Sequence, residues 1–207
     1  MREELSETFE RFLSQFENNK KVSEIDLNDS IEEKLLALTE LCAMGRTGVS
    51  RDRYTRAVEY LPLPEGPARL IKQFRTLASG IAIINRKTEI DGDVYGVIKR
   101  IGENTIPGPR NLVLKTLKRL GITYEDDQWL KTREISESTN VPSPTARLLL
   151  EDMMMLNLLN RRFFQGVQGE DPKENTPYQW QIRQEAYELM EQSEIYEFDE
   201  NFEDIPF

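Results

Sequence analysis

The chain has 207 residues, of which 38% are apolar and 31% are charged, and its formal net charge is −10. This length suits one large or two small domains, and no apolar run approaches the roughly 20 residues that a membrane helix needs. The single cysteine, Cys42, excludes an internal disulfide, and the absence of histidine excludes histidine metal sites and histidine-based catalytic triads. The acidic N-terminus lacks the apolar core of a signal peptide, so we expect a cytoplasmic protein with no membrane partner.

The charge is spread unevenly along the chain. Residues 44–120 carry 15 basic and 7 acidic side chains, whereas residues 188–207 carry 8 acidic side chains and no basic ones. A basic middle between acidic ends can face phosphate, either of a nucleotide or of a nucleic acid. It can equally pair with the acidic ends of the same chain.

Two helices are predicted in the first 45 residues. The first spans residues 3–18 and is amphipathic, with apolar residues at helical spacing: Leu5, Phe9, Phe12, Leu13 and Phe16. The second begins at a capping box formed by Ser30 and Glu33 and ends near Gly45. Its apolar face includes Cys42, which we therefore expect to be a buried small side chain.

Residues 46–63 have a less regular pattern, and the pair Pro62 and Pro64 interrupts regular structure. Within this segment, residues 51–56 read Arg-Asp-Arg-Tyr-Thr-Arg. Cations interleaved with an aromatic ring are typical of single-strand binders. The same composition is typical of a salt-bridged surface loop, and both interpretations stay open at this point.

Residues 67–106 predict two further helices. Pro67 suits the first turn of a helix, whose apolar stripe runs from Leu70 to Ile81. Asp91 is predicted to cap the next helix, with Val94 and Ile98 on its buried face. The segment 106–109, Ile-Pro-Gly-Pro, is the clearest linker, and we place a domain boundary there.

Residues 107–193 predict a winged helix, which consists of three helices and a β-hairpin. The first helix follows the linker and is closed by Gly121, the second is short and centred on Ile135, and the third has Ser143 as its N-cap. Residues 158–167 turn extended, the alternation over 178–182 predicts a strand, and 168–177 form a polar hairpin tip. One more helix is expected over 184–193, followed by an acidic, aromatic tail over 194–207 that is expected to dock elsewhere.

Residues 65–101 resemble the small helical lid of AAA+ ATPases, and the resemblance extends over roughly residues 28–105. It rests on the Gly66-Pro67-Ala68-Arg69 element that opens a helix, on the polar turn 85–88 and on the helix capped by Asp91. In that family the matching arginine reaches the nucleotide phosphates and couples the angle of the lid to the nucleotide state. The resemblance therefore implies a nucleotide-sensing role for Arg69. A surface ion pair with Glu65 or Glu59 is the alternative.

The chain departs from the family in lacking the phosphate-binding loop and the acidic strand end that holds magnesium. The segment 45–48, Gly-Arg-Thr-Gly, is too short and has no lysine. We therefore expect no enzyme activity and no cofactor in this chain, with ATP and magnesium present only if a separate ATPase domain supplies their site. No metal site is expected either.

Taken together, the sequence predicts a mainly α fold with a lid-like domain over 1–106, a winged helix over 107–193 and a tail over 194–207. The resemblance implies the C-terminal module of a AAA+ ATPase of the replication or helicase-loader type, which couples nucleotide state to DNA or to a protein partner, its own ATPase domain included. The predicted DNA contacts lie on the third helix, at the base of the wing and on the first helix: Thr145, Arg147, Arg161, Arg162, Lys115, Lys118 and Arg119.

Two alternatives remain open. One is a stand-alone winged-helix transcription regulator that dimerises through Phe9, Phe12 and Phe16. The other is an adaptor that binds proteins through the wing and the acidic tail, since the outward face of the third helix also carries Glu151 and Asp152, which oppose a phosphate-rich groove.

Overall fold

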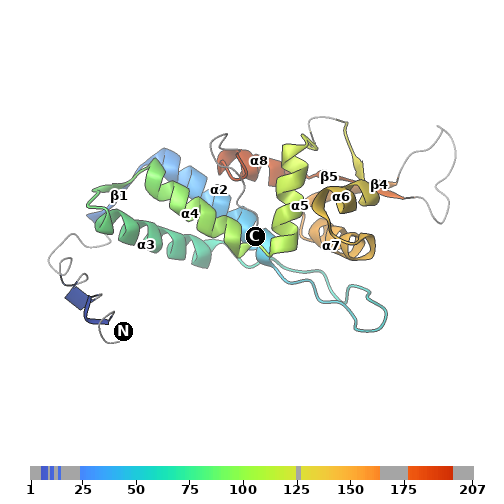
Figure 1. Cartoon of the computed structure of the whole chain (residues 1–207), viewed down its shortest axis with the longest axis horizontal. Coiled ribbons are helices and arrows are strands. Elements are labelled where there is room, and N and C mark those ends of the chain that lie inside the picture. Colours follow the sequence, from blue (N-terminus) through green and yellow to red (C-terminus); the bar gives the residue numbers. More distant parts are fainter. Residues whose placement is uncertain are drawn as a thin grey trace.

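The computed structural model describes residues 6–8, 10, 11, 14, 24–124, 127–163 and 177–197. The described part is mainly helical and elongated, with a helical bundle at one end and a helical group with a small sheet at the other (Figure 1). Helices α5 (Gly108–Arg119) and α8 (Gln184–Gln192) lie between these two ends. None of the described helices has the length and hydropathy needed to cross a membrane.

The bundle at the first end is built from three helices and two short strands. In chain order these are β1 (Asp26–Leu27), α2 (Asp29–Arg46), α3 (Ala68–Ile84), β2 (Glu89–Ile90) and α4 (Gly92–Thr105). The strands β1 and β2 pair in parallel, with Leu27 opposite Ile90. Each of the three helices packs against the other two, and apolar residues of all three predicted stripes meet in one interior, although Leu77 of α3 stays outside it.

The two predicted caps of this bundle have different outcomes. The prediction for Asp91 is confirmed, because its Oδ1 accepts from the Val94 amide at 3.1 Å. The predicted capping box at Ser30 is wrong. The N-cap is Asn28, whose Oδ1 accepts from the Ser30 amide at 2.8 Å, so α2 begins before the serine.

Helices α2 and α4 approach each other closely at two glycines. A Cβ on Gly102 would lie 3.0 Å from the Leu38 side chain, and a Cβ on Gly45 would lie 3.0 Å from that of Ile106. Between them the Cys42 thiol donates to the carbonyl of Gly102 at 3.2 Å. Cys42 is fully buried, as predicted.

The rest of the described chain forms the two helices between the ends, α5 and α8, and a second end with two helices and a three-stranded sheet. The elements are α5 (Gly108–Arg119), β3 (Leu130–Lys131), α6 (Thr132–Thr139), α7 (Ser143–Met155), β4 (Leu159–Phe163), β5 (Tyr178–Ile182) and α8 (Gln184–Gln192). The sheet is antiparallel with the order β3-β5-β4, and Arg161 of β4 lies opposite Trp180 of β5. Trp180 is fully buried, and its Nε1 donates to Thr132 Oγ1 at 2.8 Å.

Two details at this end differ from the sequence prediction. Ser143 is the first residue of α7 rather than its N-cap, which is Pro142, and its hydroxyl pairs with that of Ser136 at 2.9 Å. The strand predicted over 178–182 is confirmed, but its polar residues Gln179 and Gln181 are buried as well as its apolar ones. The amide of Gln181 donates to carbonyls of the segment before β3, which covers the second face of the strand.

The two ends are joined by α8 and the residues after it, which pack against α2. Ile195 is fully buried and Tyr196 is 5% exposed. The carbonyl of Ser193 accepts from the Tyr95 hydroxyl at 2.7 Å, and the carbonyl of Glu194 accepts from Lys99 Nζ at 3.0 Å. Apolar residues of both ends form one continuous core, which crosses the boundary predicted at residues 106–107.

Several predictions fall on residues that the structure does not describe. They are the apolar stripe of the helix at 3–18, the hairpin tip at 168–176 and the tail beyond residue 197. Residues 6–8, 10, 11 and 14 are helical where they are described. Of the predicted docking of the tail, the described part is the burial of Ile195 and Tyr196.

The burial of Cys42 gives a prediction about its reactivity. Burial raises the pKa of the thiol to about 11, so at pH 8 the native protein holds no appreciable thiolate, which is the nucleophilic form. Iodoacetamide should therefore label Cys42 of the native protein no faster than the protein unfolds. In urea, where the thiol is exposed, labelling should be rapid. The raised pKa favours the folded state below the ordinary thiol pKa of about 8.5, and this contribution is lost as the pH rises towards 11. Rapid labelling of the native protein at pH 8 would contradict this account.

Candidate functional site

The predicted nucleotide-sensing residue, Arg69, lies in the first turn of α3 and points to solvent. Its side chain is 64% exposed, and its Nε donates to Glu65 at 2.8 Å. Glu65 also lies 3.7 Å from Arg46. The surface ion pair considered as the alternative for Arg69 is therefore formed, but an ion pair at such exposure contributes little to stability.

The same side of α3 carries a shallow, mostly apolar groove. It begins at Arg69 and continues for four helical turns; its other lining residues are Lys72, Gln73, Thr76, Leu77, Gly80, Ile81 and Ile84. Leu77 is 42% exposed and Ile84 is 49% exposed, although both belong to the apolar pattern of the helix. The described residues therefore leave one apolar face of α3 open to solvent, with a cation at its N-terminal end.

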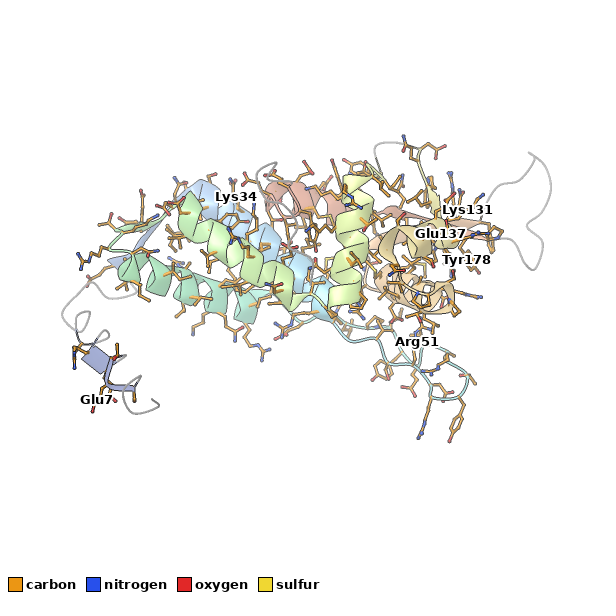
Figure 2. The ribbon with its side chains drawn as sticks, viewed as in Figure 1. Glu7, Lys34, Arg51, Lys131, Glu137 and Tyr178 are labelled. Atoms are coloured by element: carbon orange, nitrogen blue, oxygen red, sulfur yellow. The ribbon has the colours of Figure 1, made fainter. Side chains whose placement is uncertain are left out.

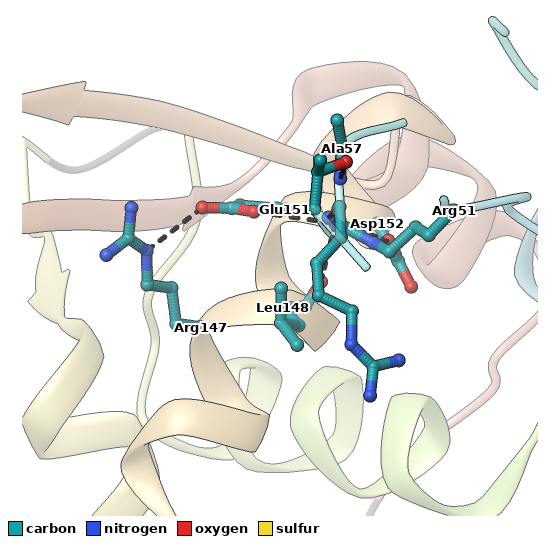
Figure 3. Close-up of polar contacts among 8 residues, drawn as sticks. Arg51, Ala57, Arg147, Leu148, Glu151 and Asp152 are labelled. Atoms are coloured by element: carbon teal, nitrogen blue, oxygen red, sulfur yellow. Dashed lines mark hydrogen bonds and ion pairs between the residues drawn. The ribbon is translucent and has the colours of Figure 1, made fainter. Parts of the chain in front are cut away.

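The acidic side chains next to the predicted DNA contacts on α7 already form ion pairs with arginines of this chain. Arg147 is exposed, and its Nε donates to Glu151 at 3.1 Å, one helical turn away. Asp152 and Glu151 both accept from Arg51, which reaches α7 from the segment after α2 (Figure 3). Thr145 is exposed in the first turn of α7. The acids that oppose phosphate binding on this helix are thus neutralised within the chain.

The ion pair of Arg51 with α7 joins two residues, Arg51 and Asp152, that are 101 positions apart in the sequence. Arg51 Nε donates to Asp152 Oδ1 at 2.7 Å, and Arg51 NH2 donates to the carbonyl of Leu148 at 3.2 Å. The side chain of Arg51 is 13% exposed. Because one guanidinium binds two acids and a backbone carbonyl of α7, it fixes the segment after α2 to this helix.

The segment fixed in this way is a small hairpin over residues 50–59. Arg51 and Val58 form an antiparallel bridge, and Glu59 donates its amide to the carbonyl of Ser50 at 3.1 Å. The hairpin projects from the body below α7 (Figure 1, cyan), and Arg51 lies at its root (Figure 2). This element is more regular than the sequence pattern indicated.

The two arginines at the base of the wing differ in their contacts. Arg162 is engaged on several sides: it pairs with Asp127 at 2.8 Å, donates to Gln179 and lies over the Trp129 ring at 4.3 Å. Arg161 is exposed and stacks on the Tyr178 ring at 4.4 Å. Of the two, Arg161 presents its guanidinium to solvent.

The three predicted contacts on α5 differ in their exposure and in their partners. Lys118 faces α8 and the turn after it: its Nζ lies 3.0 Å from a carboxylate oxygen of Glu191 and 3.0 Å from the carbonyl of Ile195, and its side chain is 11% exposed. Lys115 is half-buried and takes part in interactions within the chain. Arg119 is exposed. The structure therefore uses Lys118 to hold the C-terminal segment.

Other kinds of site have little support among the described residues. No group of three or more cysteine, aspartate and glutamate side chains in this part of the chain is arranged to hold a metal ion. Comparisons with protein-family models, with curated proteins and with solved structures gave no match to this chain.

The Arg51 contact gives a prediction about stability. Replacing Arg51 with alanine removes the partner of a mostly buried Asp152, so Arg51→Ala should lower the free energy of unfolding by about 1–3 kcal/mol. Arg53→Ala on the exposed side of the same hairpin should change it by less than about 0.5 kcal/mol. Urea unfolding followed by tryptophan fluorescence measures both. Equal stability of the two variants would show that the contact is not formed in solution.

Proposed function

We propose that this chain is the non-catalytic C-terminal part of a AAA+ ATPase of the replication or helicase-loader type. In this proposal α2, α3 and α4 form the lid, and α5 to β5 form a winged helix. The module senses the nucleotide of a separate ATPase domain through Arg69 and passes that state to DNA or to a protein partner.

The arrangement of α3 carries this proposal. Arg69 is exposed in the first turn of α3, and on the same side the described residues leave an apolar groove open. A helix that packs on a nucleotide-binding domain needs these two features. The apolar residues Leu77, Ile81 and Ile84 would meet that domain. Arg69 would exchange its weak pair with Glu65 for a phosphate, which forms a charge-assisted and potentially bidentate contact.

The order of elements at the other end supports the second half of the proposal. The order α5-β3-α6-α7-β4-β5, with a sheet ordered β3-β5-β4, supports the winged helix of this proposal, which needs three helices and a β-hairpin. In such a module α7 is the helix that enters the major groove, and β4 and β5 form the wing. Arg147 and Arg161 are the exposed cations that these elements offer to a phosphate backbone.

A second candidate, the protein-docking adaptor, is favoured by a different observation. Three large apolar side chains after the hairpin are strongly exposed: Tyr60 at 65%, Leu61 at 74% and Leu63 at 88%. Such a cluster on an extended segment is suited to a protein partner. The third candidate, a regulator that dimerises through Phe9, Phe12 and Phe16, depends on residues outside the described part of the chain.

The proposal predicts an effect of Arg69 on ATP turnover. In the protein that contains this chain together with its ATPase domain, Arg69→Ala should lower kcat for ATP hydrolysis by at least about tenfold. The reason is that the substitution removes a positive charge that stabilises the transferring phosphoryl group. Arg75→Ala is the matched control, since Arg75 is exposed on the same helix but does not line the groove. Unchanged turnover in the Arg69 variant would remove the nucleotide-sensing role.

A further inference from the structure

The tip of the hairpin over residues 50–59 carries three exposed side chains whose role the fold does not explain. Tyr54 is 88% exposed, and Arg53 and Arg56 on either side of it are exposed as well. Within the described residues, these three side chains form no ion pair, side-chain hydrogen bond or ring contact. A tyrosine in this position leaves apolar surface in water, which contributes nothing to folding.

The backbone that presents these side chains is nevertheless held firmly. The Asp52 carboxylate accepts from the amides of Tyr54 and Thr55, at 3.0 and 2.6 Å, and from the Thr55 hydroxyl at 2.8 Å. These hydrogen bonds lower the pKa of Asp52, led by that from the Thr55 amide, and keep the carboxylate charged and occupied. The Arg56 carbonyl accepts from Arg51 at 2.8 Å, with Arg56 in the left-handed region at φ 60°.

The hairpin is also tied to α7 at its root. Arg51 bonds both the Arg56 carbonyl at the tip and Asp152 on α7, so one side chain connects the two elements. The hydrogen bonds of Asp52 within the tip and those of Arg51 to α7 already restrict the backbone. The tip therefore loses little conformational entropy when it binds a ligand, which raises affinity without new contacts. The hairpin therefore has the features of a pre-organised contact element rather than of a solvated loop.

We infer that the tip of this hairpin binds single-stranded nucleic acid, with Arg53 and Arg56 on the phosphates and the Tyr54 ring stacked on a base. Aromatic rings that stack on bases and cations that follow the backbone are the common features of single-strand binders. A duplex keeps its bases stacked, so it would leave the tyrosine ring unused, and an acidic peptide would need the charges but not the ring. The inference rests on the nucleic-acid half of the proposed function and gives it a ligand and a site.

The test is fluorescence anisotropy of labelled oligo-deoxythymidylate with the full chain, over a series of salt concentrations. Tyr54→Ala should weaken binding about tenfold, because one stacked base is lost. The double variant Arg53→Ala with Arg56→Ala should reduce the slope of log K against log salt by about 1.4, from two lost phosphate contacts. Lys72→Ala with Arg75→Ala removes the same charge from α3 and should leave the affinity within about twofold, as its residues lie on another element.

A further variant distinguishes binding by a pre-organised hairpin from non-specific electrostatic attraction of the nucleic acid. Asp52→Ala makes the hairpin more positive but removes the acceptor of three hydrogen bonds at the tip. A pre-organised site predicts weaker binding by this variant, whereas non-specific attraction predicts stronger binding. Thermal unfolding of each variant shows that the fold is retained.

The outcomes are distinguishable. If the wild-type chain binds the oligonucleotide and the hairpin variants bind equally well, the hairpin inference is overturned while nucleic-acid binding by α7 and the wing stands. If the wild type binds duplex but not single strands, the stacking role is overturned. If it binds neither at low salt, the nucleic-acid half of the proposed function fails as well, and the role of Arg69 is decided separately by ATP turnover.

Discussion

The arrangement of the described helices depends on how the turn after α8 is held. Three consecutive backbone carbonyls there accept hydrogen bonds from three side chains of other helices: Ser193 from Tyr95, Glu194 from Lys99 and Ile195 from Lys118. Carbonyls at the end of a helix have no partner within it, and cations near that end are favoured by the helix dipole. With Ile195 buried beneath these contacts, the C-terminal segment joins α4, α5 and α2 into one body.

A second set of contacts links that body to the surfaces proposed to bind ligands. Arg110 at the start of α5 donates to the carbonyls of Gly45 and Thr47, at 2.9 and 2.6 Å, and so fixes the end of α2. A few residues later Arg51 binds α7, and the same segment then runs on to Arg69 at the start of α3. The chain between α2 and α3 therefore contacts both the proposed nucleotide-sensing residue and the proposed nucleic-acid surface, which gives coupling between them a physical route.

The sequence predicted the helices well, because amphipathic periodicity reports directly on burial. The helices α2, α3, α4 and α7 and the cap at Asp91 follow from local spacing and turn residues alone. What could not be predicted are contacts between distant residues. Arg51 and Asp152 are 101 positions apart, and nothing near either residue indicates the other. For the same reason the sequence pattern that predicts a DNA contact at Lys118 does not indicate its acceptors in and after α8.

The burial of β5 illustrates a second limit. A period-two pattern predicts one wet face, but the segment before β3 covers Gln179 and Gln181 and supplies carbonyls to the amide of Gln181. Polar residues in a covered strand cannot be distinguished from exposed ones without knowing what lies above them. At the candidate site, likewise, the composition of residues 51–56 left two interpretations open, and the structure divides the residues between them: Arg51 is salt-bridged, whereas Arg53, Tyr54 and Arg56 are exposed.

The central claim is that both ends form one cooperative body, and the chain carries a natural probe in each. Cys42 lies buried in α2, and both tryptophans, Trp129 and Trp180, lie at the other end. We would follow urea unfolding of the same sample by thiol labelling and by tryptophan fluorescence. One continuous core predicts coincident midpoints, as for a two-state protein. Two separated midpoints would show that the ends unfold independently and would contradict the account.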